Sequence, residues 1–121
     1  SHPWKISSVI WQTAEPPSES IQECAKDDVW TFNRDSTMGV YYGAAGCLFD
    51  GLNVFSKWSL SSDEKIFTRT YYSIFDPTKI TDEVYTVKSL ARDRMVLEIT
   101  LDLSIFGLSD KELFQYTYDA Y

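Results

Sequence analysis

The sequence predicts an all-β fold, an eight-stranded antiparallel up-and-down barrel that forms one domain over residues 1–121. Three observations carry this prediction. Short segments of alternating apolar and polar residues recur between turn residues. Patterns typical of helices are almost absent. Aromatic residues make up 16% of the chain, and their side chains favour half-buried, pleated surfaces.

The predicted strands are short and regularly spaced, as expected for a meander. In chain order they cover residues 4–12, 29–33, 37–43, 54–60, 65–74, 83–90, 95–103 and 112–118. Eight such strands can close a barrel, which removes exposed sheet edges. A two-sheet sandwich is the alternative, but it normally needs a long crossover, and the connections here are short.

Local signals place the breaks between these strands. We expect residues 1–3 to be a remnant or a disordered start, and residues 18–25 to form a short helix after two prolines, with Ser18 as its N-cap. Asp76 and Pro77 are expected to end the fifth strand.

Charge and residue types exclude several classes of function. The net charge is −7, so the chain lacks the cationic face that binds nucleic acid. The one histidine, His2, lies at the N-terminus, so a nucleophilic Ser or Cys has no histidine to act as its base. The sequence also contains no set of Cys and His residues spaced as zinc ligands. We therefore expect no catalytic residues, no metal and no cofactor. No apolar run reaches 18 residues, so no membrane helix is predicted.

The two cysteines, Cys24 and Cys47, flank a predicted strand pair. A hairpin-like return would bring them together, so we expect a disulfide and an oxidising compartment. Two buried, inert thiols are the alternative.

The residues predicted to face the barrel interior are the candidate ligand-binding set. If Asn33 pairs with Thr37, then Trp30 and Phe32 share a face with residues of the returning strand. Large apolar side chains line ligand pockets, although the same residues could simply fill the barrel. The candidate set is Trp30, Phe32, Val40, Tyr42, Trp58, Leu60, Tyr85, Val87, Leu97 and Ile99.

A second aromatic patch depends on the register of residues 65–74. If Ile66 and Thr68 point inward, Phe67 and Tyr71 point outward and could dock a protein partner. The opposite register would place Phe67 and Tyr71 in the core.

An ordered set of motifs resembles the lipocalin-like domains of small exported bacterial lipoproteins. Trp4-Lys5-Ile6 is similar to the opening W-K-L strand, residues 23–33 to a C-x-x-D-D-x-x-T-F-N segment, and Gly46-Cys47 to the position of the second family cysteine. Two further segments are also similar to family motifs, the W-x-L strand at Trp58 and a closing pair of strands. Those two matches comprise residues 58–60, 85–90 and 95–98. The family turn D-G-T reads Asp35-Ser36-Thr37 here, which puts Ser36 where a left-handed glycine is usual.

The resemblance implies a calycin-like barrel and export to the periplasm or cell surface, with the membrane reached only through a lipid anchor of the full-length precursor. Two functions remain open. The barrel could hold a small apolar ligand, or the protein could be an accessory surface lipoprotein that docks another protein through an outer aromatic face and has no ligand cavity. A cavity of roughly 300 Å³ or more lined by the candidate set would favour ligand binding, whereas a packed barrel with an exposed aromatic patch would favour docking.

Overall fold

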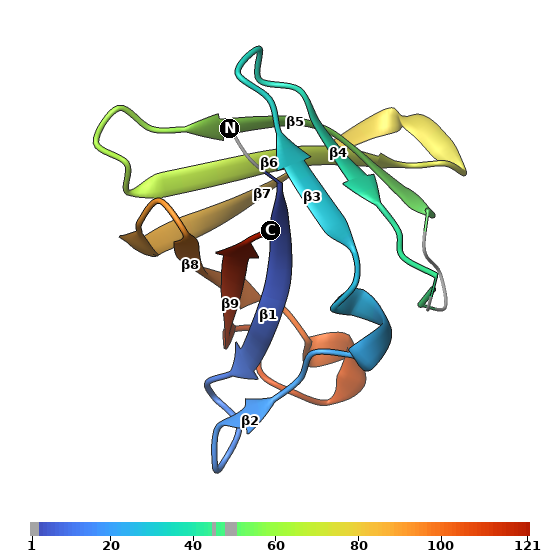
Figure 1. The fold of residues 1–121 in the computed structure, drawn as a ribbon. Helices are drawn as coiled ribbons and strands as arrows, with labels where there is room; N and C mark the ends of the chain where they lie inside the picture. The colour runs from blue at the N-terminus through green and yellow to red at the C-terminus, as the bar shows by residue number, and fades with distance from the viewer. Residues whose placement is uncertain (1–2, 45, 48–50) are drawn as a thin grey trace.

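The computed structural model describes residues 3–44, 46–47 and 51–121. Eight antiparallel strands follow one another in meander order and form a nearly closed barrel, consistent with a calycin-like fold (Figure 1). The strands are β1 Trp4–Trp11, β3 Val29–Phe32, β4 Met38–Tyr41, β5 Asn53–Leu60, β6 Ile66–Ser73, β7 Asp76–Leu90, β8 Arg94–Leu101 and β9 Glu112–Ala120. The short strand β2, Ser18–Glu19, and the 3₁₀ turns η1, Glu23–Ala25, and η2, Ser104–Phe106, complete the described elements.

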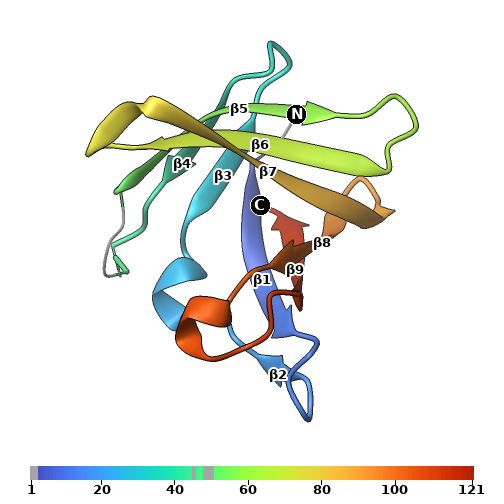
Figure 2. The same cartoon turned by 180° about the vertical axis from the view of Figure 1, so that it is seen from behind.

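The last strand closes firmly onto the first. β9 pairs with β1 from Trp4↔Ala120 to Trp11↔Phe114, and β8 pairs with the other edge of β9. Tyr121 N donates to Pro3 O over 2.9 Å, so both ends of the described chain lie at the same end of the barrel. Figure 2 shows the long β7 running across the back of the barrel toward β8.

Two predicted boundaries were wrong. Residues 18–25 do not form a helix: β2 pairs with the end of β1, and only η1 is helical. An isolated helical turn is weak, whereas pairing with an existing strand adds main-chain hydrogen bonds without a new nucleus. The sixth strand was expected to begin at Glu83, after a break at Asp76 and Pro77, but β7 already begins at Asp76. Pro77 is tolerated because β8 pairs with β7 only from Thr86 onward, so no ladder bond is needed there.

The register of β6 resolves the open question about its faces. Phe67 is 3% exposed, whereas Ile66 is 40% exposed. Tyr71 also points inward, where its ring lies 5.4 Å from that of Phe55. The outward placement of Phe67 and Tyr71 was therefore wrong. The inward face of β6 also carries Arg69, which is buried.

The β3–β4 hairpin is joined to its neighbours by few main-chain contacts. β3 and β4 pair with each other over four residues, but β3 meets β1 only at Trp4↔Trp30. β4 meets β5 only through the isolated bridge Thr37↔Lys57. Side chains must therefore hold this hairpin in the barrel wall, and its buried Trp30, Phe32 and Met38 do so.

The hairpin turn adopts the predicted pairing. Asn33 N donates to Thr37 O over 2.8 Å, and Ser36 has φ of 71°, in the left-handed region. A non-glycine residue costs roughly 1–2 kcal/mol there. The Asp35 carboxylate accepts hydrogen bonds from the side chain and main chain of Thr37, which stabilise the turn and lower the pKa of Asp35.

The predicted disulfide is present and encloses this hairpin. Cys24 in η1 precedes β3, Cys47 follows β4, and their Cα atoms are 5.2 Å apart. The bond thus ties together the two ends of the segment that has the fewest ladder bonds to its neighbours. A disulfide of this kind indicates an extracytoplasmic compartment. Among the described residues, no helix has the length and apolar character needed to cross a membrane.

Removing the disulfide should loosen the hairpin. The bond closes a loop with a sequence separation of 23 residues. We expect the Cys24→Ser/Cys47→Ser variant to lose about 3 kcal/mol in free energy of unfolding, measured by urea denaturation. The wild type under reducing conditions is the matched control and should unfold at the midpoint of the variant. A variant that unfolds together with the oxidised wild type would contradict this role.

Candidate functional site

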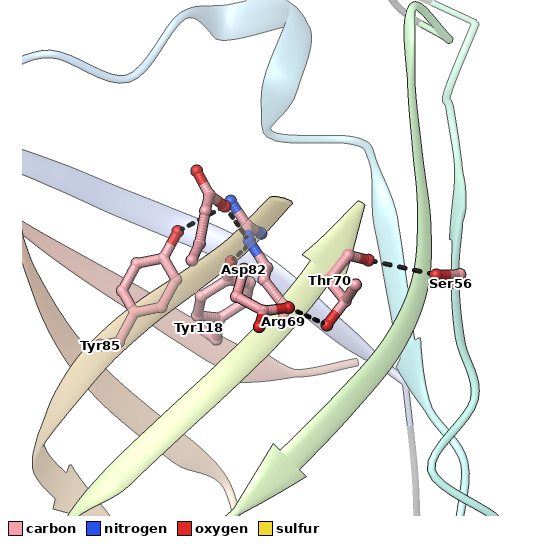
Figure 3. Close-up of polar contacts among 7 residues, drawn as sticks. Ser56, Arg69, Thr70, Asp82, Tyr85 and Tyr118 are labelled. Carbon is pink, nitrogen blue, oxygen red and sulfur yellow. Dashed lines mark hydrogen bonds and ion pairs between the residues drawn. The ribbon is translucent and has the colours of Figure 1, made fainter. Parts of the chain in front are cut away.

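A charged side chain occupies the middle of the barrel. Arg69, from β6, is 6% exposed. Its Nε lies 2.6 Å from Glu83 Oε1, and its Nη1 donates to the Tyr118 hydroxyl over 3.2 Å. The Tyr85 hydroxyl donates to the same Glu83 oxygen over 3.2 Å. Figure 3 shows Arg69, Tyr85 and Tyr118 converging from three different strands.

Aromatic rings surround the guanidinium of Arg69. Its central carbon lies 4.6 Å from the ring centroid of Phe55, 4.9 Å from that of Trp30 and 5.3 Å from that of Tyr85. Cations at these distances are attracted by the negative faces of the rings. One side chain thereby contacts β3, β5, β7 and β9. We call Arg69, Glu83, Tyr118 and the three rings the arginine cluster.

The arginine cluster keeps fixed charges near neutral pH. Burial acts to lower the pKa of Arg69. The contributions of Tyr118, Tyr85 and Glu83 outweigh this effect and raise the pKa above its ordinary value, so the guanidinium stays charged. Burial raises the pKa of Tyr118 to about 12, against the opposing effect of Arg69. Burial likewise raises the pKa of Tyr85. Both phenols are therefore neutral, and the cluster fills the middle of the barrel as a fixed structural element.

An apolar cavity of about 160 Å³ lies beyond the arginine cluster, toward the end of the barrel where the chain starts. Phe32 and Phe67 separate it from the cluster, since their rings contact Tyr118 and Tyr85 respectively. The indole of Trp58 stacks on Phe67 with a centroid distance of 6.1 Å. The lining residues are Trp4, Phe32, Trp58, Leu60, Phe67, Leu90 and Met95. No polar side-chain group beyond the two indole N–H groups is present in this lining.

Two other hollows lie between the β3–β4 hairpin and β5. One, of about 400 Å³, is an open depression beside the β3–β4 turn, and Phe32, Trp58 and Leu60 line both it and the apolar cavity. The other, of about 270 Å³, lies where β4 and β5 diverge and includes Val40 and Tyr42.

The predicted interior residues are distributed over several environments instead of one pocket. Phe32, Trp58 and Leu60 line the apolar cavity. Trp30 and Tyr85 belong to the arginine cluster, and Val40 and Tyr42 line the separate hollow between β4 and β5. The remaining three, Val87, Leu97 and Ile99, belong to the packed core.

Trp58 is only partly buried, because it lies at the junction of β5 with the β3–β4 turn. Its Nε1 donates to Asn33 O over 2.8 Å, and its main-chain N donates to Ser36 O over 3.0 Å. This residue therefore joins the two strands where the barrel has its weakest ladder.

Sequence reasoning missed four cavity residues and the arginine cluster. Trp4 alternates with polar Lys5 in the first strand, and this alternation is a signal that could have placed it in the interior. Phe67 was missed because the register of β6 was left open, so this residue was not placed in the interior set. Arg69 gave no signal, since a charged residue is almost never fully buried unless its partners are nearby, and these partners are distant in sequence. Leu90 and Met95, at strand ends, were not singled out.

A second polar group, Glu112, fastens the opposite end of the barrel. It is 7% exposed, and its carboxylate accepts hydrogen bonds from Trp11 Nε1, Thr13 Oγ1 and Ser109 N. The end of β1, the start of β9 and the loop after η2 are thereby tied together. The hydrogen bonds from Thr13 and then Trp11 lower the pKa of Glu112.

Comparison with known proteins finds no match, since no protein-family model, curated protein or solved structure is significantly similar to this chain.

Replacing Arg69 should destabilise the whole barrel. In Arg69→Met the partly buried Glu83 loses its cation, and removing one partner of a buried pair typically costs about 3–5 kcal/mol. The Arg69→Met/Glu83→Gln variant removes both charges and should recover part of this loss in urea denaturation. Arg94→Met is the matched control, because its ion pair with Asp119 is solvent-exposed, and it should change stability little. Strictly additive losses from the two cluster substitutions would show that the pair is not coupled.

Glu112 should make stability depend on acid pH. Its pKa in the folded protein lies below the ordinary value of 4.5, so the carboxylate stabilises the fold above that pH and ceases to do so as the pH falls through the lowered pKa. The gap in unfolding free energy between the wild type and Glu112→Gln should therefore be constant near pH 6 and shrink below about pH 4. The exposed Glu15→Gln should not reproduce this behaviour. A gap that is unchanged down to pH 2 would contradict the assignment.

Proposed function

We propose that this protein is an exported, lipocalin-like binding protein that holds a small apolar molecule. The observation that carries the proposal is the cavity of about 160 Å³ lined by aromatic and aliphatic side chains at one end of the barrel. Such a lining offers hydrophobic contact and ring stacking, with few groups that fix orientation. Moderate affinity and broad selectivity follow from that chemistry.

The volume of the cavity sets the size of the ligand. An engineered protein cavity of about 150 Å³ takes up benzene, so a single aromatic ring matches this site. Drug-sized ligands fill pockets of roughly 300–1,000 Å³. The arginine cluster blocks further extension along the barrel axis, because Arg69 and Tyr118 occupy the middle of the interior. The proposed ligand is therefore compact, and its role is reversible binding without turnover.

The proposed location is the periplasm or the cell surface, through a lipid anchor in the precursor. The disulfide supports an oxidising compartment. The resemblance of the Trp4 strand, the Cys24 segment and the Trp58 strand to exported bacterial lipoproteins supports the finer assignment.

A role in docking another protein is the second proposal. Phe67 is buried and cannot contact a partner, but other apolar side chains are exposed around the β6–β7 turn. Phe75 is 80% exposed, Ile80 68% and Ile74 48%. Exposed apolar groups that lie together mark interaction surfaces more often than isolated ones do.

Titration with indole and toluene tests the cavity directly. Both should raise the melting temperature, and toluene should also shift tryptophan fluorescence, with dissociation constants on the order of 100 μM, as expected for ligands of this size. Oleate and retinol should bind far more weakly. Leu90→Phe, which adds bulk to the lining, should weaken binding, whereas Ile80→Phe, on the exposed hairpin, should not. If neither small ligand has an effect at 1 mM or so, the binding proposal fails and docking becomes the better explanation.

A further inference from the structure

The apolar cavity and the depression beside the β3–β4 turn share part of their lining. Phe32, Trp58 and Leu60 line both spaces. Phe32 is buried, so it belongs to the fixed wall, whereas Trp58 is only partly buried. The side chains shared by the two hollows therefore include one aromatic ring that is partly in contact with solvent.

The ring and the main chain of Trp58 are attached to the hairpin by separate hydrogen bonds. Its indole is fixed by one hydrogen bond, from Nε1 to Asn33 O, whereas its main-chain N–H makes a separate hydrogen bond to Ser36 O. A rotation of the side chain breaks the first bond and leaves the second in place. The junction between β5 and the hairpin therefore does not depend on the position of the indole ring.

The chemistry of the outer depression differs from that of the inner cavity. Besides the three shared side chains, it is lined by Arg34, Ser36 and Ser59. Arg34 is exposed and, among the described residues, forms no ion pair, although the protein carries a net charge of −7. The adjacent Asp35 is engaged with Thr37 inside the turn. A cation and two hydroxyl groups therefore stand directly outside an apolar cavity that fits one ring.

We propose that the natural ligand is a small amphipathic acid, whose aromatic or compact apolar part occupies the inner cavity while its carboxylate binds Arg34 in the outer depression. This inference rests on the proposed binding function and names the ligand class of the same site. The guanidinium of arginine pairs with carboxylates through two parallel hydrogen bonds, and the serine hydroxyls can donate further ones. Trp58 lies between the two parts of the ligand and stacks on its apolar part or moves aside.

A matched pair of ligands separates the two levels of the proposal. 3-Phenylpropanoate and 3-phenylpropanamide share the same ring and chain and differ only in charge. Both should bind through the ring, and the acid should bind about fivefold more tightly at low salt, the upper range for a solvent-exposed ion pair. This preference should decline at 1 M NaCl or so, because salt screens exposed charges. Calorimetry or a thermal-shift titration measures both constants.

Two variants with the same change in net charge complete the test. Arg34→Gln should abolish the preference for the acid and leave binding of the amide unchanged. Lys79→Gln, on exposed β7, should leave the preference intact.

The outcomes distinguish the two proposals. Equal affinities for acid and amide, or an acid preference that survives Arg34→Gln, would overturn the inference while leaving the apolar binding function standing. Failure of both ligands, together with failure of indole and toluene, would remove the binding function itself.

Discussion

The packing of the barrel interior depends on the contacts of the buried Arg69. A guanidinium that is removed from water needs an opposite charge and hydrogen-bond partners nearby. Glu83 supplies the opposite charge at 2.6 Å, Tyr118 accepts a hydrogen bond, and the rings of Trp30 and Phe55 cover the faces of the cation. These groups come from β3, β5, β7 and β9, so their requirements can be met together only when the barrel is assembled. The cluster thereby favours one register for each of these strands.

The second constraint is closure. Most neighbouring strands are joined by long ladders, but the β3–β4 hairpin contacts β1 and β5 through one residue pair on each side. The hairpin is held in the wall instead by its buried aromatic side chains, by the Cys24–Cys47 disulfide at its base and by Trp58 at its turn. The barrel wall is therefore continuous in side-chain packing but sparse in main-chain hydrogen bonds at this hairpin. The two hollows near β5 follow from that spacing.

Together these constraints decide where a ligand can be accommodated. The arginine cluster fills the middle of the barrel, so the interior is not the single open cup that the inward-facing residues first suggest. The apolar cavity lies at the end near the β3–β4 turn, where the wall includes Trp58, and a separate hollow lies where β4 and β5 diverge. A polar rim carrying Arg34 lies next to the apolar cavity. Binding at this end needs no rearrangement of the ladders that hold β6 to β9.

The sequence by itself determined the strand pattern, the pairing of Asn33 with Thr37 and the proximity of the two cysteines, because alternation, turn residues and a short return are local properties. It left the face of β6 open, since shifting the register by one residue exchanges Ile66 and Phe67 between core and surface. Only the tertiary structure decided this, by bringing Glu83 and Tyr118 to Arg69 from strands distant in sequence. The same holds for the cavity, whose lining comes from six strands, and for Pro77, which lies in β7 because β8 does not reach it. Each of these outcomes depends on a neighbour that no local pattern in the chain specifies.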